Sequence, residues 1–277
     1  MAKDNYHNHI DTEAENQRLS SQHELIKFFC NGLVKAPIDL TKSGQRVLDS
    51  ATADGFWMRE MRALMHPTTE FLGFDIIPGL EDSQEKFPKN IKLKEQSVLE
   101  DFPVEWTNAF DLVHQRLLLV LFPDEDVVKI LRRLVDCVKP GGWIQLFEGD
   151  GSKQLYDRRA RYFEVFYRIT EKTLKSPEIG RYLSDYLHDA GMINVKHEAV
   201  DFEIGAANPD RKIASRAVQN ILGVVDLVKP FTSADAVGLS QEEWINLGKN
   251  MENDLKKYKV AMRYHTVWAQ KPWEVGS

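Results

Sequence analysis

Between residues 44 and 150, short apolar runs alternate with longer segments whose apolar residues recur at helical spacing. Short apolar runs are typical of buried strands, and the longer segments are typical of amphipathic helices. We expect five strands, at about 46–48, 70–76, 91–95, 110–114 and 143–148. Strands and helices that alternate in this order predict an α/β fold with a parallel, doubly wound sheet.

Helical patterns dominate on both sides of this region. A helix is expected from Glu15 to about Gly32, where Gln22 and His23 are solvated or capping residues by default. The alternative is that this helix folds back over a binding site as a lid. After residue 150 we expect an aromatic-rich helix over 156–174, helices over 179–190, 211–228 and 242–258, and strands over 195–204 and 261–269.

Composition narrows the class of protein. The chain has 277 residues, a net charge of −6 and no block of basic residues, which argues against nucleic acid as a partner. No apolar run approaches the roughly 20 residues that cross a bilayer, and the N-terminus has no apolar signal segment. We therefore expect a cytoplasmic protein that binds no membrane. Cys30 and Cys137 predict buried free thiols and are too few for a zinc site. Whether the protein is a homodimer stays open.

The stretch RVLDSATADG, residues 46–55, carries the clearest functional signal. A strand, a tight loop of small residues and a helix start can bind a ligand closely, because helix N-termini offer unpaired N–H groups. Loops that bind nucleotides usually contain several glycines, whereas here Ala51 and Ala53 occupy two of those positions and only Gly55 remains. An ordinary strand-to-helix turn is the alternative.

Asp75 favours a nucleoside-binding site. It ends the second predicted strand, near the roughly 20-residue interval that separates such a loop from a ribose-binding carboxylate. One carboxylate can accept hydrogen bonds from both ribose hydroxyls. The carboxyl ends of parallel strands share one edge, where Ala51, Asp75, Ser97, His114 and Glu148 would all project.

The order of elements resembles the class I S-adenosylmethionine-dependent methyltransferases, whose seventh strand returns antiparallel between the fifth and sixth. The segments VLDSATADGFW, FLGFDIIP, FDLVHQR, VKPGGWIQLFE and YHTVWAQKP are most similar to the fungal secondary-metabolite methyltransferases, which include the LaeA-like proteins. The resemblance implies a Rossmann-like seven-stranded sheet whose last strand is antiparallel. It also implies a helical lid over 1–40, a methyltransferase domain over 41–277, and helical cap segments at about 152–190 and 208–258.

The resemblance assigns roles to individual residues. The methionine part of S-adenosylmethionine would lie over Ala51, Thr52, Ala53 and Gly55, which follow Asp49. Asp75 would bind the ribose, Ile76 the adenine ring, and Ser97 and Val98 the adenine edge. The sulfonium and the methyl acceptor would lie near His114, Gln115 and Arg116. The two alanines narrow the loop, and we expect their backbone φ angles to be negative.

Chemistry at the acceptor depends on fewer residues. His114 is the candidate general base or orienting group, although a hydrogen-bonded histidine at a strand end is the alternative. The candidate substrate contacts are Gln22, Trp57, Phe147, Glu148, Phe163, Phe166 and Tyr167, of which the aromatic residues could equally be core. No metal is expected.

Three functions remain open at this stage. The first is a methyltransferase that acts on O, N or S of a small-molecule secondary metabolite. The second is a cyclase or dehydratase that uses bound S-adenosylmethionine without methyl transfer. The third is a LaeA-like regulatory protein that acts through protein partners.

Overall fold

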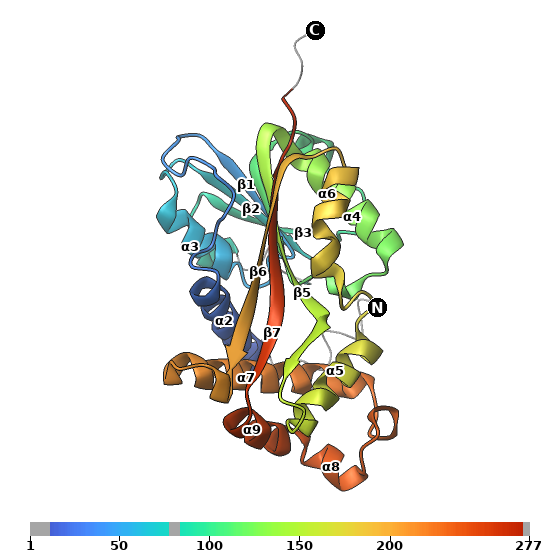
Figure 1. Cartoon of the computed structure of the whole chain (residues 1–277). Helices are drawn as coiled ribbons and strands as arrows, with labels where there is room; N and C mark the ends of the chain where they lie inside the picture. The colour runs from blue at the N-terminus through green and yellow to red at the C-terminus, as the bar shows by residue number, and fades with distance from the viewer. Residues whose placement is uncertain (1–11, 78–83, 274–277) are drawn as a thin grey trace.

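The computed structural model describes residues 12–77 and 84–273. Its centre is a seven-stranded sheet with the order β3-β2-β1-β4-β5-β7-β6 (Figure 1). The strands are β1 (Arg46–Ser50), β2 (Glu70–Asp75), β3 (Ile91–Glu95), β4 (Phe110–Arg116), β5 (Val138–Tyr156), β6 (Ile193–Ile204) and β7 (Val260–Gln270). Strands β1 to β5 pair in parallel, and β7 lies antiparallel between β5 and β6. The sequence prediction of a doubly wound sheet with an antiparallel last strand is therefore confirmed.

Helices cover both faces of the sheet and the carboxyl ends of its strands (Figure 1). They are α2 (Thr12–Phe29), α3 (Phe56–Leu64), α4 (Asp124–Cys137), α5 (Arg161–Thr173), α6 (Leu183–Asp189), α7 (Arg211–Val228), α8 (Gln241–Ile245) and α9 (Leu247–Lys257). Helix α3 packs on one face, and α4 and α6 pack on the other. Helices α2, α5, α7 and α9 share one apolar core at the carboxyl end of the sheet.

Side chains alternate between the two faces of the sheet along each strand, and this alternation produces a separate apolar core on each face. Val47 packs with Met58 and Met61 of α3, while the next residue, Leu48, packs with Val127 of α4. Successive side chains of a strand point to opposite faces, so a continuous apolar run serves two helical layers. The same alternation decides which residues at the end of each strand face the functional site.

Strand β5 is longer than the sequence predicted. It begins at Val138 and runs to Tyr156, with a register shift between Asp150 and Leu155. Its extension pairs with β7, where Tyr156 lies opposite Val260. The prediction that Tyr156 lies on a helix was therefore wrong, because a strand from the far end of the chain provides hydrogen-bond partners that local pattern does not reveal.

Two smaller predictions also needed correction. The segment predicted as one helix over 179–190 is a 3-10 turn (Ile179–Tyr182) followed by α6. The segment over 242–258 is divided into α8 and α9 at Asn246.

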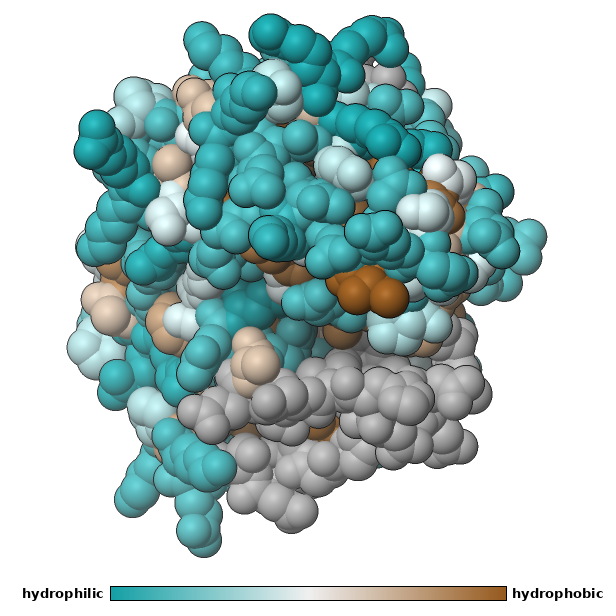
Figure 2. Space-filling view, turned by 90° about the horizontal axis from the view of Figure 1, so that it is seen from below, coloured by the Kyte–Doolittle hydropathy of each residue, from teal (hydrophilic) through white to brown (hydrophobic). Residues whose placement is uncertain are grey.

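The face seen from below is mainly hydrophilic, with apolar side chains in small separate areas (Figure 2). Among the described residues, no helix is both long and apolar enough to cross a membrane. Cys30 and Cys137 are buried free thiols, as predicted.

Candidate active site

The loop after β1 is held tightly against β2. The N–H of Thr52 donates to the carbonyl oxygen of Phe74 at 3.0 Å, and the N–H of Gly55 donates to the carbonyl oxygen of Thr52 at 2.9 Å. Gly73 in β2 allows this approach, because a Cβ there would lie 2.2 Å from the Met58 side chain and 2.9 Å from that of Thr52. These contacts fix the loop against β2.

Ala51 and Ala53 do not have the negative φ angles that we expected. Their φ angles are +53° and +48°, in the left-handed region that favours glycine. That conformation costs an L-residue roughly 1–2 kcal/mol. The loop thus keeps a backbone shape suited to glycine while carrying two methyl groups.

Asp75 lies beside this loop at the carboxyl end of β2. Its Oδ2 accepts from the N–H of Ala53 at 2.9 Å, and its Oδ1 accepts from the N–H of Ile76 at 2.7 Å. The N–H of Gln96 donates to the carbonyl oxygen of Asp75, which brings the segment with Ser97 alongside. A carboxylate has about four acceptor positions, so one that fixes a loop can also receive ribose hydroxyls.

Asp49 and His114 form a buried pair next to the loop. The Nδ1 of His114 lies 2.7 Å from Oδ1 of Asp49, and the hydroxyl of Thr52 donates to Oδ2 of Asp49 at 2.8 Å. Since a carboxylate only accepts, Nδ1 of His114 carries the proton and Nε2 is left with a lone pair. Burial lowers the pKa of His114, whereas the hydrogen bond to Asp49 opposes that shift. The imidazole is therefore a neutral acceptor.

Trp57 fixes the plane of this imidazole. The two rings are stacked, with centroids 3.7 Å apart and an interplanar angle of 2°. Trp57 is the second residue of α3 and follows the loop closely, so the loop, the base candidate and the first turn of α3 pack together.

A small pocket opens on the face of the sheet that carries His114, between α2, the end of β4 and the middle of β5 and β7. It is lined by Ile26, Cys30, Gly32, Leu33, Lys35, Trp57, His114, Arg116, Gln145, Phe147 and Thr266. Two predicted substrate contacts, Trp57 and Phe147, are among them. Gln145 was not among the predicted site residues, although strand alternation places it on the same face as Phe147. The amide of Gln145 accepts from the N–H of Lys35 and donates to the carbonyl oxygen of Leu33, which fixes the segment after α2.

Gln115 and Glu148 point to the opposite face of the sheet. The amide of Gln115 donates to Oε1 of Glu148 at 2.7 Å, and the N–H groups of Leu118 and Leu119 donate to the same oxygen at 2.8 Å. Burial raises the pKa of Glu148 to about 7, although these donors oppose the shift. Glu148 thus anchors the loop after β4 and does not line the pocket, in contrast to its predicted contact with substrate.

The aromatic residues of α5 belong to the core of the helical cap. Phe163, Phe166 and Tyr167 are buried and pack on one another. None of them lines the pocket, and neither does the half-buried Gln22. The structure therefore favours the core interpretation that the sequence had left open for these rings.

His23 of α2 does not follow the default interpretation of its sequence position. It was expected by default to be solvated or to act as a cap, but its side chain is fully buried between Phe56, Glu60 and Arg116. Helical spacing gave a usable signal, because Ile26 and Cys30 follow His23 by three and seven residues and share its face.

Comparison with known proteins agrees with this architecture. Residues 47–142 match the family model described as a methyltransferase domain. N-methyltransferase verN of Clonostachys rogersoniana is 36% identical over 262 residues, which cover 95% of this chain and 91% of verN. N-methyltransferase gliN of Aspergillus fumigatus is 30% identical, with 94% of each chain covered.

Solved structures show the same fold at lower identity. Phosphoethanolamine N-methyltransferase 2 of Haemonchus contortus, solved with S-adenosyl-L-methionine, is 16% identical with a TM-score of 0.52, covering 93% of this chain and 52% of that one. A methyltransferase of Haloferax volcanii, solved with the activator Trm112, is 13% identical with a TM-score of 0.54, covering 94% and 95%.

The fold, together with the match to methyltransferases over nearly the whole chain, defines an enzyme of the methyltransferase class. The chain belongs to the class I S-adenosylmethionine-dependent methyltransferases, within the fungal secondary-metabolite group that contains verN and gliN. The first of the three functions considered above, methylation of a small molecule with S-adenosylmethionine as donor, is thereby confirmed in its general form.

Proposed function

We propose that this enzyme methylates a nitrogen atom that is uncharged in the bound small molecule. Relatives that cover most of the chain are named as N-methyltransferases. The observation that carries the proposal is the charge of the pocket. Among the described residues, its lining contains no carboxylate, and its cation Lys35 is paired with Glu198 at 3.0 Å. A protonated amine would find no counter-ion in this lining, whereas a neutral N–H group beside an apolar wall needs none.

His114 is the group that would receive the proton of that N–H. Its Nδ1–H is held by Asp49, its ring plane is fixed by Trp57, and it lines the pocket. A neutral imidazole held in one tautomer and one orientation can accept a proton without reorganising first. His114 therefore serves as the general base of the proposed reaction.

The loop and Asp75 would hold the cofactor. The left-handed backbone at Ala51 and Ala53 and the carboxylate at the end of β2 suit a nucleoside with an amino-acid tail. When bound, S-adenosylmethionine supplies a methyl group on a sulfonium, which is a strong electrophile. The contribution of the chain is to bring the acceptor in line, to exclude water and to accept a proton. Helix α2, packed on α3 and α7, would act as the lid.

The acceptor atom is tested with matched small molecules. A series that differs only in carrying N–H, O–H or S–H at one ring position is incubated with enzyme and S-adenosylmethionine, and S-adenosylhomocysteine is quantified. The N–H member is expected to give product, and His114→Asn to slow it by about 100-fold. Arg46→Gln, at the far end of β1, is the matched control. Product from the O–H or S–H member alone would contradict the proposal.

A further inference from the structure

Arg116 brings a positive charge to the place where the loop over 51–55 meets the pocket. It ends β4 on the pocket face, two positions after His114. Its nearest charged surroundings are the carboxylates of Asp49, Asp54 and Glu60, which oppose the fall in its pKa that burial causes. Within the part of the chain that the structure describes, it forms an ion pair with none of them.

The hydrogen-bond contact of Arg116 is to the lid helix. Its Nη1 lies 3.1 Å from Nδ1 of His23. Because a guanidinium only donates, Nδ1 of His23 must be the acceptor, and the ring proton is on Nε2, 3.3 Å from Oε2 of Glu60. Burial and the charge of Arg116 lower the pKa of His23 to about 4, so the ring is neutral near pH 7. One contact of this kind leaves most of the five N–H donors of a guanidinium open to an anionic ligand.

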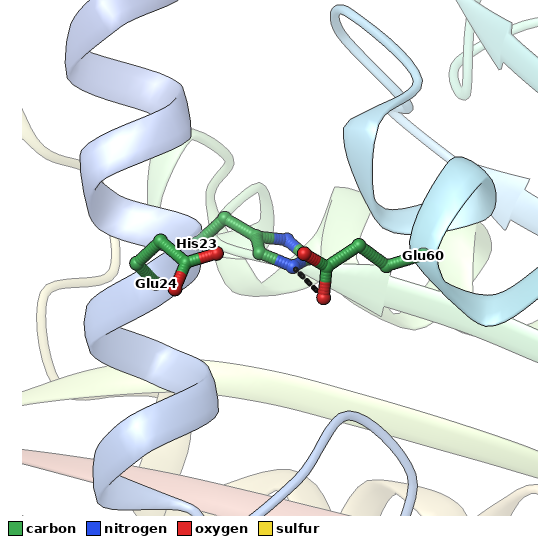
Figure 3. Close-up of side chains that lie close together, drawn as sticks. All are labelled: His23, Glu24 and Glu60. Carbon is green, nitrogen blue, oxygen red and sulfur yellow. Dashed lines mark ion pairs between the residues drawn. The ribbon is translucent and has the colours of Figure 1, made fainter. Parts of the chain in front are cut away.

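The neighbouring carboxylates are already paired. His23, Glu24 and Glu60 lie close together between α2 and α3 (Figure 3). The ammonium group of Lys27 lies 2.8 Å from Glu24 and 2.9 Å from both carboxylate oxygens of Glu60. Lys27 therefore supplies the cation that this trio requires, and a metal ion is not needed. The same contacts fix α2 against α3 and hold His23 over Arg116.

We infer that Arg116 binds the carboxylate of the methionine part of the cofactor, and that His23 positions the guanidinium and thereby couples cofactor binding to the closure of α2. This inference rests on the proposed function. The cofactor carries one carboxylate, one ammonium and one sulfonium, and the carboxylate is the group that a guanidinium attracts. Arg116 lies next to the loop that the cofactor's amino-acid tail would follow, since Ser50 and Gln115 are paired across β1 and β4.

The test compares two ligands that differ in the amino-acid tail. S-adenosylhomocysteine has the carboxylate, whereas 5′-methylthioadenosine has the same nucleoside and no tail. Calorimetric titration of Arg116→Gln is expected to show a loss of affinity of about 10- to 100-fold for S-adenosylhomocysteine. The affinity for 5′-methylthioadenosine should stay within about 3-fold of wild type. Arg46→Gln, which removes the same charge far from the site, should alter neither.

His23→Gln provides the second arm, with circular dichroism to show that each variant is folded. It should weaken S-adenosylhomocysteine less than Arg116→Gln does and leave 5′-methylthioadenosine unchanged. In wild type, hydrogen exchange of α2 amides should slow with S-adenosylhomocysteine and not with 5′-methylthioadenosine. Equal loss of both ligands in Arg116→Gln, or equal protection of α2 by both, would overturn the inference. A wild-type protein that binds neither ligand would instead overturn the proposed function.

Discussion

Glu148 should make the stability of the protein depend on pH in an unusual direction. Its pKa is about 7 in the folded state, against an ordinary value of 4.5. Between these two pH values the folded protein holds a proton that the unfolded chain releases. The free energy of unfolding therefore falls as the pH rises from about 4.5 to about 7 and stays lower above that. This is the opposite of the behaviour of a carboxylate in a salt bridge.

The size of the effect follows from the shift. About 2.5 pKa units at 1.36 kcal/mol per unit correspond to about 3 kcal/mol. One kcal/mol moves the Tm of a chain of this size by roughly 2–4 °C, so the full effect is about 10 °C. Glu148→Gln removes the titration and keeps a carbonyl oxygen for the N–H groups of Leu118 and Leu119.

Scanning calorimetry at pH 5.5 and pH 8.5 measures this difference. Relative to wild type, Glu148→Gln should gain several degrees more in Tm at the higher pH than at the lower pH. Glu105→Gln removes the same charge from an exposed side chain and should show no such dependence. If the Tm difference between Glu148→Gln and wild type is the same at both pH values, the account of this buried carboxyl is wrong.

Three further predictions concern the loop, the base and the lid. Ala53→Gly should leave the free energy of unfolding unchanged or raise it by up to about 1 kcal/mol. The strain of a left-handed φ angle at an alanine is at least as large as the extra entropy that glycine gives the unfolded chain. A clear fall in Tm would contradict this. Asp49→Asn should lower kcat by about 100-fold, since His114 would lose its fixed tautomer, and an unchanged kcat would remove the pair from the mechanism. The pKa of His23 is about 4 in the folded protein, against an ordinary value of 6.5, so between these pH values the unfolded chain binds a proton that the folded protein does not. The free energy of unfolding therefore falls by about 3 kcal/mol as the pH drops from 6.5 to 4. His23→Gln should reduce the fall of Tm over this pH range.

The sheet was predictable where neighbouring residues determine an element. Strand β3 has the predicted bounds, Ile91–Glu95, and α7 has the predicted bounds, Arg211–Val228, because apolar spacing alone defines both. The extension of β5 to Tyr156 was not predictable in this way, since it depends on pairing with β7 more than a hundred residues later. Non-local hydrogen bonds leave no periodic signal in the strand that gains them.

The candidate site was predictable in its position and less so in its details. The predicted ends of the strands identified the loop, Asp75 and His114 as site candidates, and the structure brings them to one edge of the sheet. Glu148 was assigned to the wrong face, although strict alternation from His114 and Phe147 would have placed it correctly. The left-handed φ angle at Ala53 could not be read from the sequence, because it depends on how the loop packs against β2.

The measurement that tests the central claim most directly is calorimetric titration of the purified protein with S-adenosylhomocysteine, with Asp75→Ala alongside. We expect wild type to bind, and Asp75→Ala to weaken binding by about 1–3 kcal/mol, the cost of losing a charged hydrogen-bond partner. Asp101→Ala, in an exposed position, should bind as wild type does. Binding that is unaffected by Asp75→Ala would contradict the assigned site, and no binding by wild type would contradict the account as a whole.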